Sequence, residues 1–245
     1  MSSQLSKSFS APSQVVAEEE RIRREYQRRS ALALDSRYSF FNRGHLRIIQ
    51  EVERCFLEGL SRNGFSNLRD TRILEIGCGN GFWLRELISW GARPGNLAGI
   101  DILEDRIHEA RDLAPHDLEL RCCSAAETGY SNNHFDLIIQ STVFTSILNA
   151  EVRRQIAWEM LRVLRSGGSV FWYDFRISNP RNSGVRGIGK AEIRDLFPGC
   201  PIKYRSLTVL PPLTRSLFNK LPSFYGPISR LKLLNTHYIA WIKKP

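Results

Sequence analysis

The sequence predicts an α/β fold, in which a doubly wound, mostly parallel sheet carries helices on both faces. Strand-like and helix-like segments alternate along residues 71–197, a pattern that is typical of parallel strands joined by crossover helices. A turn with three glycines, within residues 77–81, joins the first of these strands to the first of these helices. With 245 residues, of which 42% are hydrophobic, the chain is large enough to bury the core of one such domain.

Each expected strand is a short apolar run that is bounded by turn-forming residues. We predict seven strands, at 71–76, 96–101, 117–123, 135–140, 169–175, 202–210 and 237–242. The expected helices show apolar residues at helical spacing, and they lie at 45–60, 81–90, 104–113, 150–165 and 189–197. Residues 211–230 form an apolar and basic segment that is punctuated by proline, and the pattern assigns no element to it.

The chain before residue 45 differs from the rest, and we interpret residues 1–44 as an N-terminal extension to a domain that spans residues 45–245. Residues 1–16 are serine-rich and lack periodicity, so we expect no regular structure there. From Glu18 to Arg29 the acids come first and the bases last, which matches the helix macrodipole and predicts a surface helix. We expect residues 18–41 to act as a mobile cover, because they carry few apolar anchors.

The glycine turn carries the strongest functional signal in the chain. Glycine is needed where the backbone adopts a positive φ or lies against a ligand, so Gly77, Gly79 and Gly81 predict a cofactor held against the main chain. Asp101 ends the next strand, where a doubly wound fold places the carboxylate that binds ribose hydroxyls. NAD is disfavoured because Phe82 occupies the third glycine position of its fingerprint, and a P-loop is disfavoured because no Gly-Lys-Ser/Thr follows.

Composition limits the compartment and the partners. Five cysteines without a C-x-x-C pair favour free thiols in a reducing compartment, and no signal core or membrane span is visible, so we expect a soluble, cytoplasmic protein. The net charge is +10, and residues 201–245 carry eight basic and no acidic side chains. Such asymmetry fits either a solvated basic face or an anionic partner, and peripheral membrane contact stays open.

The ordered motifs of residues 71–175 resemble those of class I S-adenosylmethionine-dependent methyltransferases. The glycine turn of residues 74–81 and the segment Gly99-Ile100-Asp101-Ile102 are similar to the first two motifs of that family. Residues 124–127 resemble the loop beside the adenine, and residues 161–168 resemble the turn into the fifth strand. The resemblance implies a Rossmann-like fold whose last strand is antiparallel beside the fifth, with residues 71–175 as the core that binds S-adenosylmethionine.

The resemblance also implies a role for particular residues. The main chain of the glycine turn would contact the methionine end of the cofactor, Glu75 would support that turn, and Asp101 would accept from both ribose hydroxyls. Ser124 and Ala125 would face the adenine edge, and the N-terminal helix would cover the cofactor. The implied cofactor-binding residues are Tyr26, Glu75, Gly77, Cys78, Gly79, Gly81, Asp101, Ile102, Ser124, Ala125 and Gln140.

We expect methyl transfer to a small molecule or to a lipid-linked or glycan-linked biosynthetic intermediate, with a hydroxyl as the acceptor and no metal ion. The sulfonium is already activated, so positioning supplies most of the rate and a base removes the hydroxyl proton. The expected bases are Asp174, which ends the fifth strand, and His45, with His134 and His237 as weaker choices.

Residues 176–234 mix bases with apolar groups, and we expect this region to lie on the acceptor side, with Arg176 or Arg181 meeting an anionic group of the acceptor. Two other functions stay open. An RNA methyltransferase would explain the basic charge, although no appended RNA-binding module is visible. A non-catalytic subunit would bind the cofactor without turning it over.

Overall fold

The sheet of this protein has seven strands, and all of them follow the predicted order along the chain. The computed structural model describes residues 12–31, 38–180, 182–220, 225, 228 and 232–245. The strands are β1 (Ile73–Ile76), β2 (Leu97–Asp101), β3 (Glu119–Cys122), β4 (Phe135–Ser141), β5 (Leu164–Phe175), β6 (Ile202–Val209) and β7 (Asn235–Lys243). Their spatial order is β3-β2-β1-β4-β5-β7-β6. Strand β7 is antiparallel to both of its neighbours, β5 and β6, which confirms the expected antiparallel last strand.

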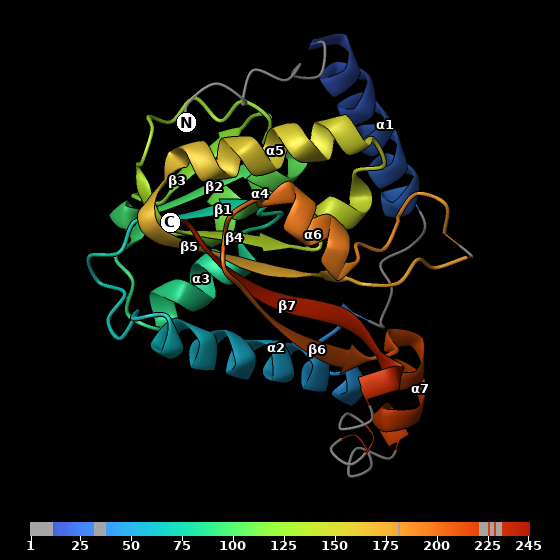
Figure 1. The fold of residues 1–245 in the computed structure, drawn as a ribbon. Helices are drawn as coiled ribbons and strands as arrows, with labels where there is room; N and C mark the ends of the chain where they lie inside the picture. Colours follow the sequence, from blue (N-terminus) through green and yellow to red (C-terminus); the bar gives the residue numbers. More distant parts are fainter. Residues whose placement is uncertain (1–11, 32–37, 181, 221–224, 226–227, 229–231) are drawn as a thin grey trace.

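Helices cover both faces of the sheet, as Figure 1 shows for α5 above it and α2 and α3 below it. The helices are α1 (Pro12–Ala31), α2 (Arg43–Arg62), α3 (Phe82–Ser89), α4 (Glu104–Leu113), α5 (Ala150–Val163), α6 (Lys190–Leu196) and α7 (Pro211–Lys220). Apolar side chains of α2, α3 and α4 share one core cluster with one face of the sheet. Side chains of α1, α5 and α6 share the cluster on the other face. This is the doubly wound arrangement that the alternating sequence pattern predicts.

Three elements differ from the sequence prediction. Helix α1 begins at Pro12, so residues 12–16, for which we expected no regular structure, are helical, and Val15 is buried against the core; residues 1–11 lie outside the described part of the chain. Strand β5 begins at Leu164, because that residue already pairs with Phe135 of β4. Segment 211–230 contains α7, whose two prolines lie in its first turn, where the absent N–H groups cost no helical hydrogen bond.

The strand register brings the cofactor motifs to one edge of the sheet. Ile76, at the end of β1, lies beside Ile100 of β2 and beside Gln140 of β4. The turns that follow these three parallel strands therefore meet at one place, beyond their carboxyl ends. The five cysteines are free thiols, as expected, and no described helix combines the length and the apolar character that a membrane crossing requires.

Candidate functional site

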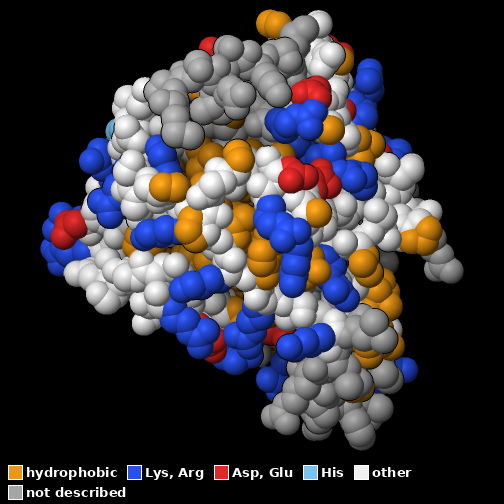
Figure 2. Space-filling model, viewed as in Figure 1, with side chains coloured by type: hydrophobic (Ala, Val, Ile, Leu, Met, Phe, Trp, Pro, Cys, Tyr) orange, Lys and Arg blue, Asp and Glu red, His pale blue; other side chains and the backbone are white. Residues whose placement is uncertain are grey.

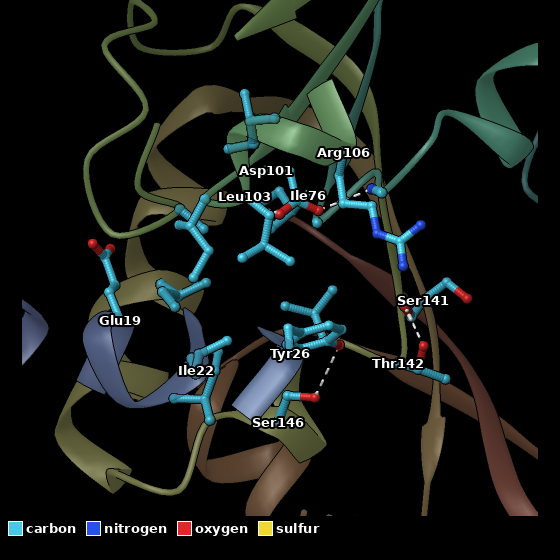
Figure 3. A pocket seen from close by; sticks show the side chains of 18 of the residues that line it. Glu19, Ile22, Tyr26, Ile76, Asp101, Leu103, Arg106, Ser141, Thr142 and Ser146 are labelled. Atoms are coloured by element: carbon cyan, nitrogen blue, oxygen red, sulfur yellow. Dashed lines mark hydrogen bonds between the residues drawn. The ribbon is translucent and has the colours of Figure 1, made fainter. Parts of the chain in front are cut away.

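A cavity of about 540 Å³ lies beyond the carboxyl ends of β1, β2 and β4. Its wall is built by segments that are distant in sequence, among them the glycine turn, the turn between β2 and α4, the turn after β4, and α1. Figure 3 shows Asp101, Leu103 and Arg106 on one side of this space, with Ile22 and Tyr26 of α1 and Ser146 on the other. A cavity of this size is within the range of small-molecule and cofactor sites, roughly 300–1,000 Å³.

The glycine turn lies so close to the turn after β4 that a side chain would not fit at its first glycine. Gly77 has a φ of +63°, and a Cβ atom built on it would lie 2.5 Å from Cγ2 of Val143. Gly81 has a φ of +73° and caps the start of α3. Gly77 and Gly79 line the cavity, whereas Gly81 and the buried Cys78 lie behind its surface. The turn thus presents bare main chain to the cavity, as the sequence pattern predicts.

Asp101 is fixed at the cavity wall by two backbone donors. Gly79 N donates to its Oδ2 atom and Leu103 N donates to its Oδ1 atom, each at 2.9 Å. Burial raises the pKa of the Asp101 carboxyl, and these N–H groups act against that shift. Each carboxylate oxygen has a second lone pair, so the group retains the capacity to accept from two further hydroxyls.

Glu75 is completely enclosed and does not reach the cavity surface. Burial, and next the charge of Asp101, raise the pKa of Glu75 well above its usual range. Its Oε2 atom has no hydrogen-bond partner among the described residues. The carboxyl of Glu75 has a hydrogen bond with the backbone of Leu84 in α3, and Glu75 does not line the cavity.

The turn after β4 supplies wall residues that sequence reasoning missed. Ser141, Thr142, Val143 and Ser146 line the cavity, and Thr142 has a φ of +59°. Gln140, which we expected to face the ligand, is instead completely buried, and its Oε1 atom accepts from Val143 N at 3.2 Å. The amide of Gln140 therefore holds the turn in place. The signal in the sequence was the polar run Gln-Ser-Thr directly after a buried strand.

Helix α1 closes the cavity from the side opposite the sheet. Its residues Glu19, Ile22 and Tyr26 line the cavity, and the Tyr26 hydroxyl lies 3.5 Å from Oγ of Ser146, as drawn in Figure 3. The helix is anchored by Glu18, whose buried carboxylate accepts from the backbone N–H of Leu148. The covering position expected for Tyr26 is thus the position in which the structure places it.

The other predicted cofactor residues divide between the wall and its support. Ile102 and Ala125 line the cavity, next to Leu103 and Cys123. Ser124 does not line it, because its Oγ atom accepts from Ala126 N at 3.1 Å and thereby closes a local turn. The hydroxyl of Ser124 is consequently engaged within its own loop, and the adenine-side wall is formed by neighbouring residues.

Comparisons with known proteins agree with this geometry. Residues 73–168 match the family model described as methyltransferase domain. The chain is 26% identical over 120 residues to arsenite methyltransferase of Mus musculus, across 44% of this chain and 31% of that protein. It is 28% identical over 106 residues to the biotin biosynthesis bifunctional protein BioHC of Cellvibrio japonicus, across 43% of this chain and 20% of that protein. This chain therefore spans less than a third of either relative.

A solved structure extends the likeness beyond the matched core. The PH0226 protein from Pyrococcus horikoshii superposes with a TM-score of 0.62 at 17% sequence identity, over 90% of this chain and 99% of that one. Such a match shows a shared fold, which is the Rossmann-like fold of class I S-adenosylmethionine-dependent methyltransferases. Residues 73–168 of this fold match a methyltransferase domain. S-adenosylmethionine is the cofactor of this class, and the methyltransferase domain carries the glycine turn and Asp101 at the cavity.

Asp174 lies outside the cavity of the methyltransferase domain, contrary to our expectation for a base. Its Oδ1 atom accepts from the Thr145 hydroxyl at 2.6 Å and from Phe175 N at 2.9 Å, and its Oδ2 atom accepts from Thr145 N at 3.2 Å. Burial raises the pKa of this carboxyl to about 6. Because every donor around it belongs to the protein, Asp174 ties β5 to the turn after β4 and has no access to an acceptor.

Replacing Asp174 with asparagine should therefore lower stability and spare the cofactor site. The new amide N–H groups would face donors, so we expect the free energy of unfolding to fall by about 1–3 kcal/mol, with unchanged affinity for S-adenosylhomocysteine.

The stability difference between the wild type and this variant should also depend on pH. The Asp174 carboxyl binds a proton more tightly in the folded state than in the unfolded state, so its contribution to the free energy of unfolding weakens as the pH rises from about 4 to about 6. The difference in unfolding free energy should therefore shrink over that range. Urea titrations at both pH values measure this, with the exposed Asp195→Asn as control. Normal stability with lost turnover would contradict the structural role.

His45 is buried and does not line the cavity, but it lies beside Tyr38, which does. Its imidazole is 5.8 Å from the ring of Tyr38 and 6.0 Å from that of Phe40, and Tyr38 itself lines the cavity. Burial, and next the charge of Arg215, lower the pKa of His45, so the imidazole is neutral at pH 7. Its Nδ1 atom is buried without a hydrogen-bond partner among the described residues.

The two weaker histidine candidates lie elsewhere. His134 stacks on Tyr130 and lies 3.3 Å from the Ser131 hydroxyl, with no part in the cavity wall. His237 is buried and stacks on Tyr173 with ring centroids 4.8 Å apart. Burial lowers the pKa of His237 to about 3. Among the described residues, no group of three or more His, Cys, Asp or Glu side chains is arranged to hold a metal ion.

Proposed function

We propose that this protein transfers the methyl group of S-adenosylmethionine to a hydroxyl of a small molecule or of a lipid-linked or glycan-linked biosynthetic intermediate. The observation that carries the proposal is the cavity itself, which places the bare main chain of the glycine turn beside the fixed carboxylate of Asp101. In this arrangement Asp101 would accept from the ribose hydroxyls, and Gly77 and Gly79 would contact the methionine end. Tyr26 of α1 would cover the bound cofactor.

We expect the acceptor hydroxyl to enter the cavity beside Tyr38 and Phe82. The cofactor supplies an activated methyl group, so the protein mainly has to hold an acceptor oxygen in line with it. Tyr38 and Phe82 provide ring faces at the cavity wall, and His45 lies directly behind Tyr38. A neutral imidazole can accept the hydroxyl proton, and for this role we propose His45, because its ring lies beside Tyr38 of the cavity wall and, unlike Asp174, it has an unpartnered ring nitrogen among the described residues.

The surface charge favours a small acceptor over RNA. Basic side chains of the C-terminal third are engaged within the protein: Arg205 pairs with Glu58 at 2.9 Å, and Lys190 lies over the rings of Tyr204 and Tyr238. Figure 2 shows basic side chains spread over this face among apolar and acidic ones. Bases that are engaged in this way are less available for the backbone contacts that RNA binding requires.

Two measurements on the purified protein test the proposal. Calorimetric titration with S-adenosylhomocysteine should show binding to one site. Incubation with methyl-labelled S-adenosylmethionine and a protein-free, nucleic-acid-free metabolite extract should transfer label to a small organic product. Cofactor binding without any labelled product would support a non-catalytic subunit, and label that appears in added RNA would support the RNA alternative. Absence of cofactor binding would refute the proposed function altogether.

Replacing His45 with glutamine should lower turnover by about 100-fold, within the usual effect of a general base, and should leave S-adenosylhomocysteine affinity unchanged. The pKa of His45 lies below its usual value of 6.5, so the wild-type rate should be constant near neutral pH and should fall only when the pH drops below that lowered pKa. The variant should lose this acid limb. A pH–rate profile of both proteins measures the effect, and an unchanged acid limb in the variant would assign the titration to another group.

A further inference from the structure

Arg215 of α7 lies over the ring of Tyr38, a residue of the cavity wall. Its guanidinium carbon is 4.2 Å from the centroid of that ring. In the described part of the chain no carboxylate forms an ion pair with Arg215, and its buried Nε atom has no hydrogen-bond partner. A half-buried guanidinium that forms no ion pair within the described residues is suited to bind an anion.

The main chain of Arg215 is fixed by the start of α2. Asn42 Nδ2 donates to the carbonyl oxygen of Arg215 at 3.3 Å. Gly44 leaves room for this approach, since a Cβ atom at that position would lie 2.9 Å from Cα of Arg215 and 2.1 Å from O of Thr214. Helix α7 is thus docked closely on the first turn of α2, and the position of Arg215 relative to Tyr38 follows from that contact.

The charge of Arg215 acts on both imidazoles near it. It lowers the pKa of His45 and of His237, in both cases second to burial. Glu51 and Asp174 act together with Arg215 on Tyr173, which stacks on His237. The first turn of α2 contains no acidic side chain, so the positive end of that helix is not neutralised there. An anion at this place would meet a guanidinium, a helix N-terminus and uncharged rings.

The other arginine that we considered for an anion is already engaged. Arg176 donates from Nε to the carbonyl oxygen of Asn235 at 2.6 Å and lies over the ring of Tyr238. It holds β5 against the start of β7, and it does not line the cavity. Arg181 lies outside the described residues. Arg215 therefore replaces Arg176 as the residue that we expect to meet the acceptor.

From these contacts we propose that Arg215 binds an oxyanion of the acceptor, a carboxylate or a phosphate, while the ring of Tyr38 lies against the acceptor's body. This inference rests on the proposed function and names its substrate class: an acceptor that is anionic at one end and bears a flat or apolar body. The guanidinium fork is held by Tyr38 on one face, so its N–H edge presents two parallel donors to the oxyanion.

The test uses three probes that share one ring: benzoate, phenyl phosphate and the neutral benzamide. Each is titrated by NMR into the full-length protein, both saturated with S-adenosylhomocysteine and without it. At least one acid should bind about tenfold or more tightly than benzamide, and the acid that binds identifies the oxyanion. Arg215→Met should abolish that preference, and Arg215→Lys should retain only part of it, because an ammonium lacks the fork. Lys220→Met, an exposed base on the same helix, should bind as the wild type does.

Equal binding of acids and benzamide, or an acid preference that survives in Arg215→Met, would overturn the inference, as would the failure of both acids to bind the wild type. If Arg215→Met does not fold, the comparison of Arg215→Lys with Lys220→Met decides in the same way. Calorimetry with S-adenosylhomocysteine alone remains the separate test of the proposed function. If the protein does not bind S-adenosylhomocysteine but still prefers the acids over benzamide, the proposed cofactor is refuted and the proposed anion site is retained.

Discussion

Replacing Asp101 with alanine should weaken the binding of S-adenosylhomocysteine by roughly 30-fold to 1,000-fold without unfolding the protein. Two charge-assisted hydrogen bonds to ribose hydroxyls contribute about 2–4 kcal/mol together, which gives that range. The carboxylate also accepts from Gly79 N and Leu103 N, so its loss releases the glycine turn from the end of β2. Both effects act in the same direction. Calorimetric titration of the variant measures the affinity, and thermal unfolding monitors the fold.

Two further variants make the Asp101 result specific. Asp105→Ala removes an exposed acid from the same turn and should leave the affinity unchanged. Asp101→Asn keeps one acceptor oxygen of the same shape, so its affinity should lie between those of the wild type and of Asp101→Ala. Equal affinity of the wild type and Asp101→Ala would remove Asp101 from the ligand site and would require another explanation for the cavity.

Replacing Glu18 with alanine should detach α1 and reduce cofactor affinity by about tenfold or more. The Glu18 carboxylate accepts from Leu148 N and Asn149 N and pairs with Arg21, which in turn donates to the carbonyl oxygen of Ser146. These contacts join α1 to the loop that follows β4. Without them, two half-buried backbone N–H groups lose their acceptor, and the helix that carries Tyr26 loses its carboxylate anchor to this loop.

Hydrogen exchange distinguishes this local effect from general destabilisation. The backbone amides of α1 should exchange faster in Glu18→Ala, while those of β1, β4 and β5 should keep their protection. Glu20→Ala, which removes an exposed acid two residues away, should change neither exchange nor affinity. If α1 stays protected in Glu18→Ala, the helix is a permanent part of the core, and the expectation that residues 18–41 form a mobile cover is wrong.

The cofactor side of the site could be predicted because its signals are local. Gly77 and Gly79 indicate a local backbone conformation, and Asp101 indicates the end of a strand. The position of each residue could therefore be predicted from the few residues around it. Asp174 and Gln140 also end strands, yet their side chains turn inward. That choice depends on donors at Thr145 and Val143, whose positions follow from tertiary packing.

The surroundings of Arg215, where we propose that the acceptor binds, could not be predicted, because the contacts there join residues that are distant in sequence. Asn42 and Arg215 are 173 positions apart, and nothing in either neighbourhood indicates that they meet. Gly44 is the residue that lets α7 approach α2, and its sequence neighbourhood gives no sign of that contact. Contacts of this kind appear only when the whole sheet and its flanking helices have been assembled.

The order of strands at one edge of the sheet has a consequence for assembly during synthesis. Strand β7 lies between β5 and β6 in space but follows both along the chain, and β6 pairs with β7. While the chain grows from its N-terminus, β6 has no described neighbour to join until β7 has been made, whereas β1 to β5 can already pair with one another. The cofactor half of the cavity can therefore form on the nascent chain. Helix α7, which lies between β6 and β7 in sequence, is made after β1 to β5, so the arginine that we propose to bind the acceptor is placed later than the cofactor half.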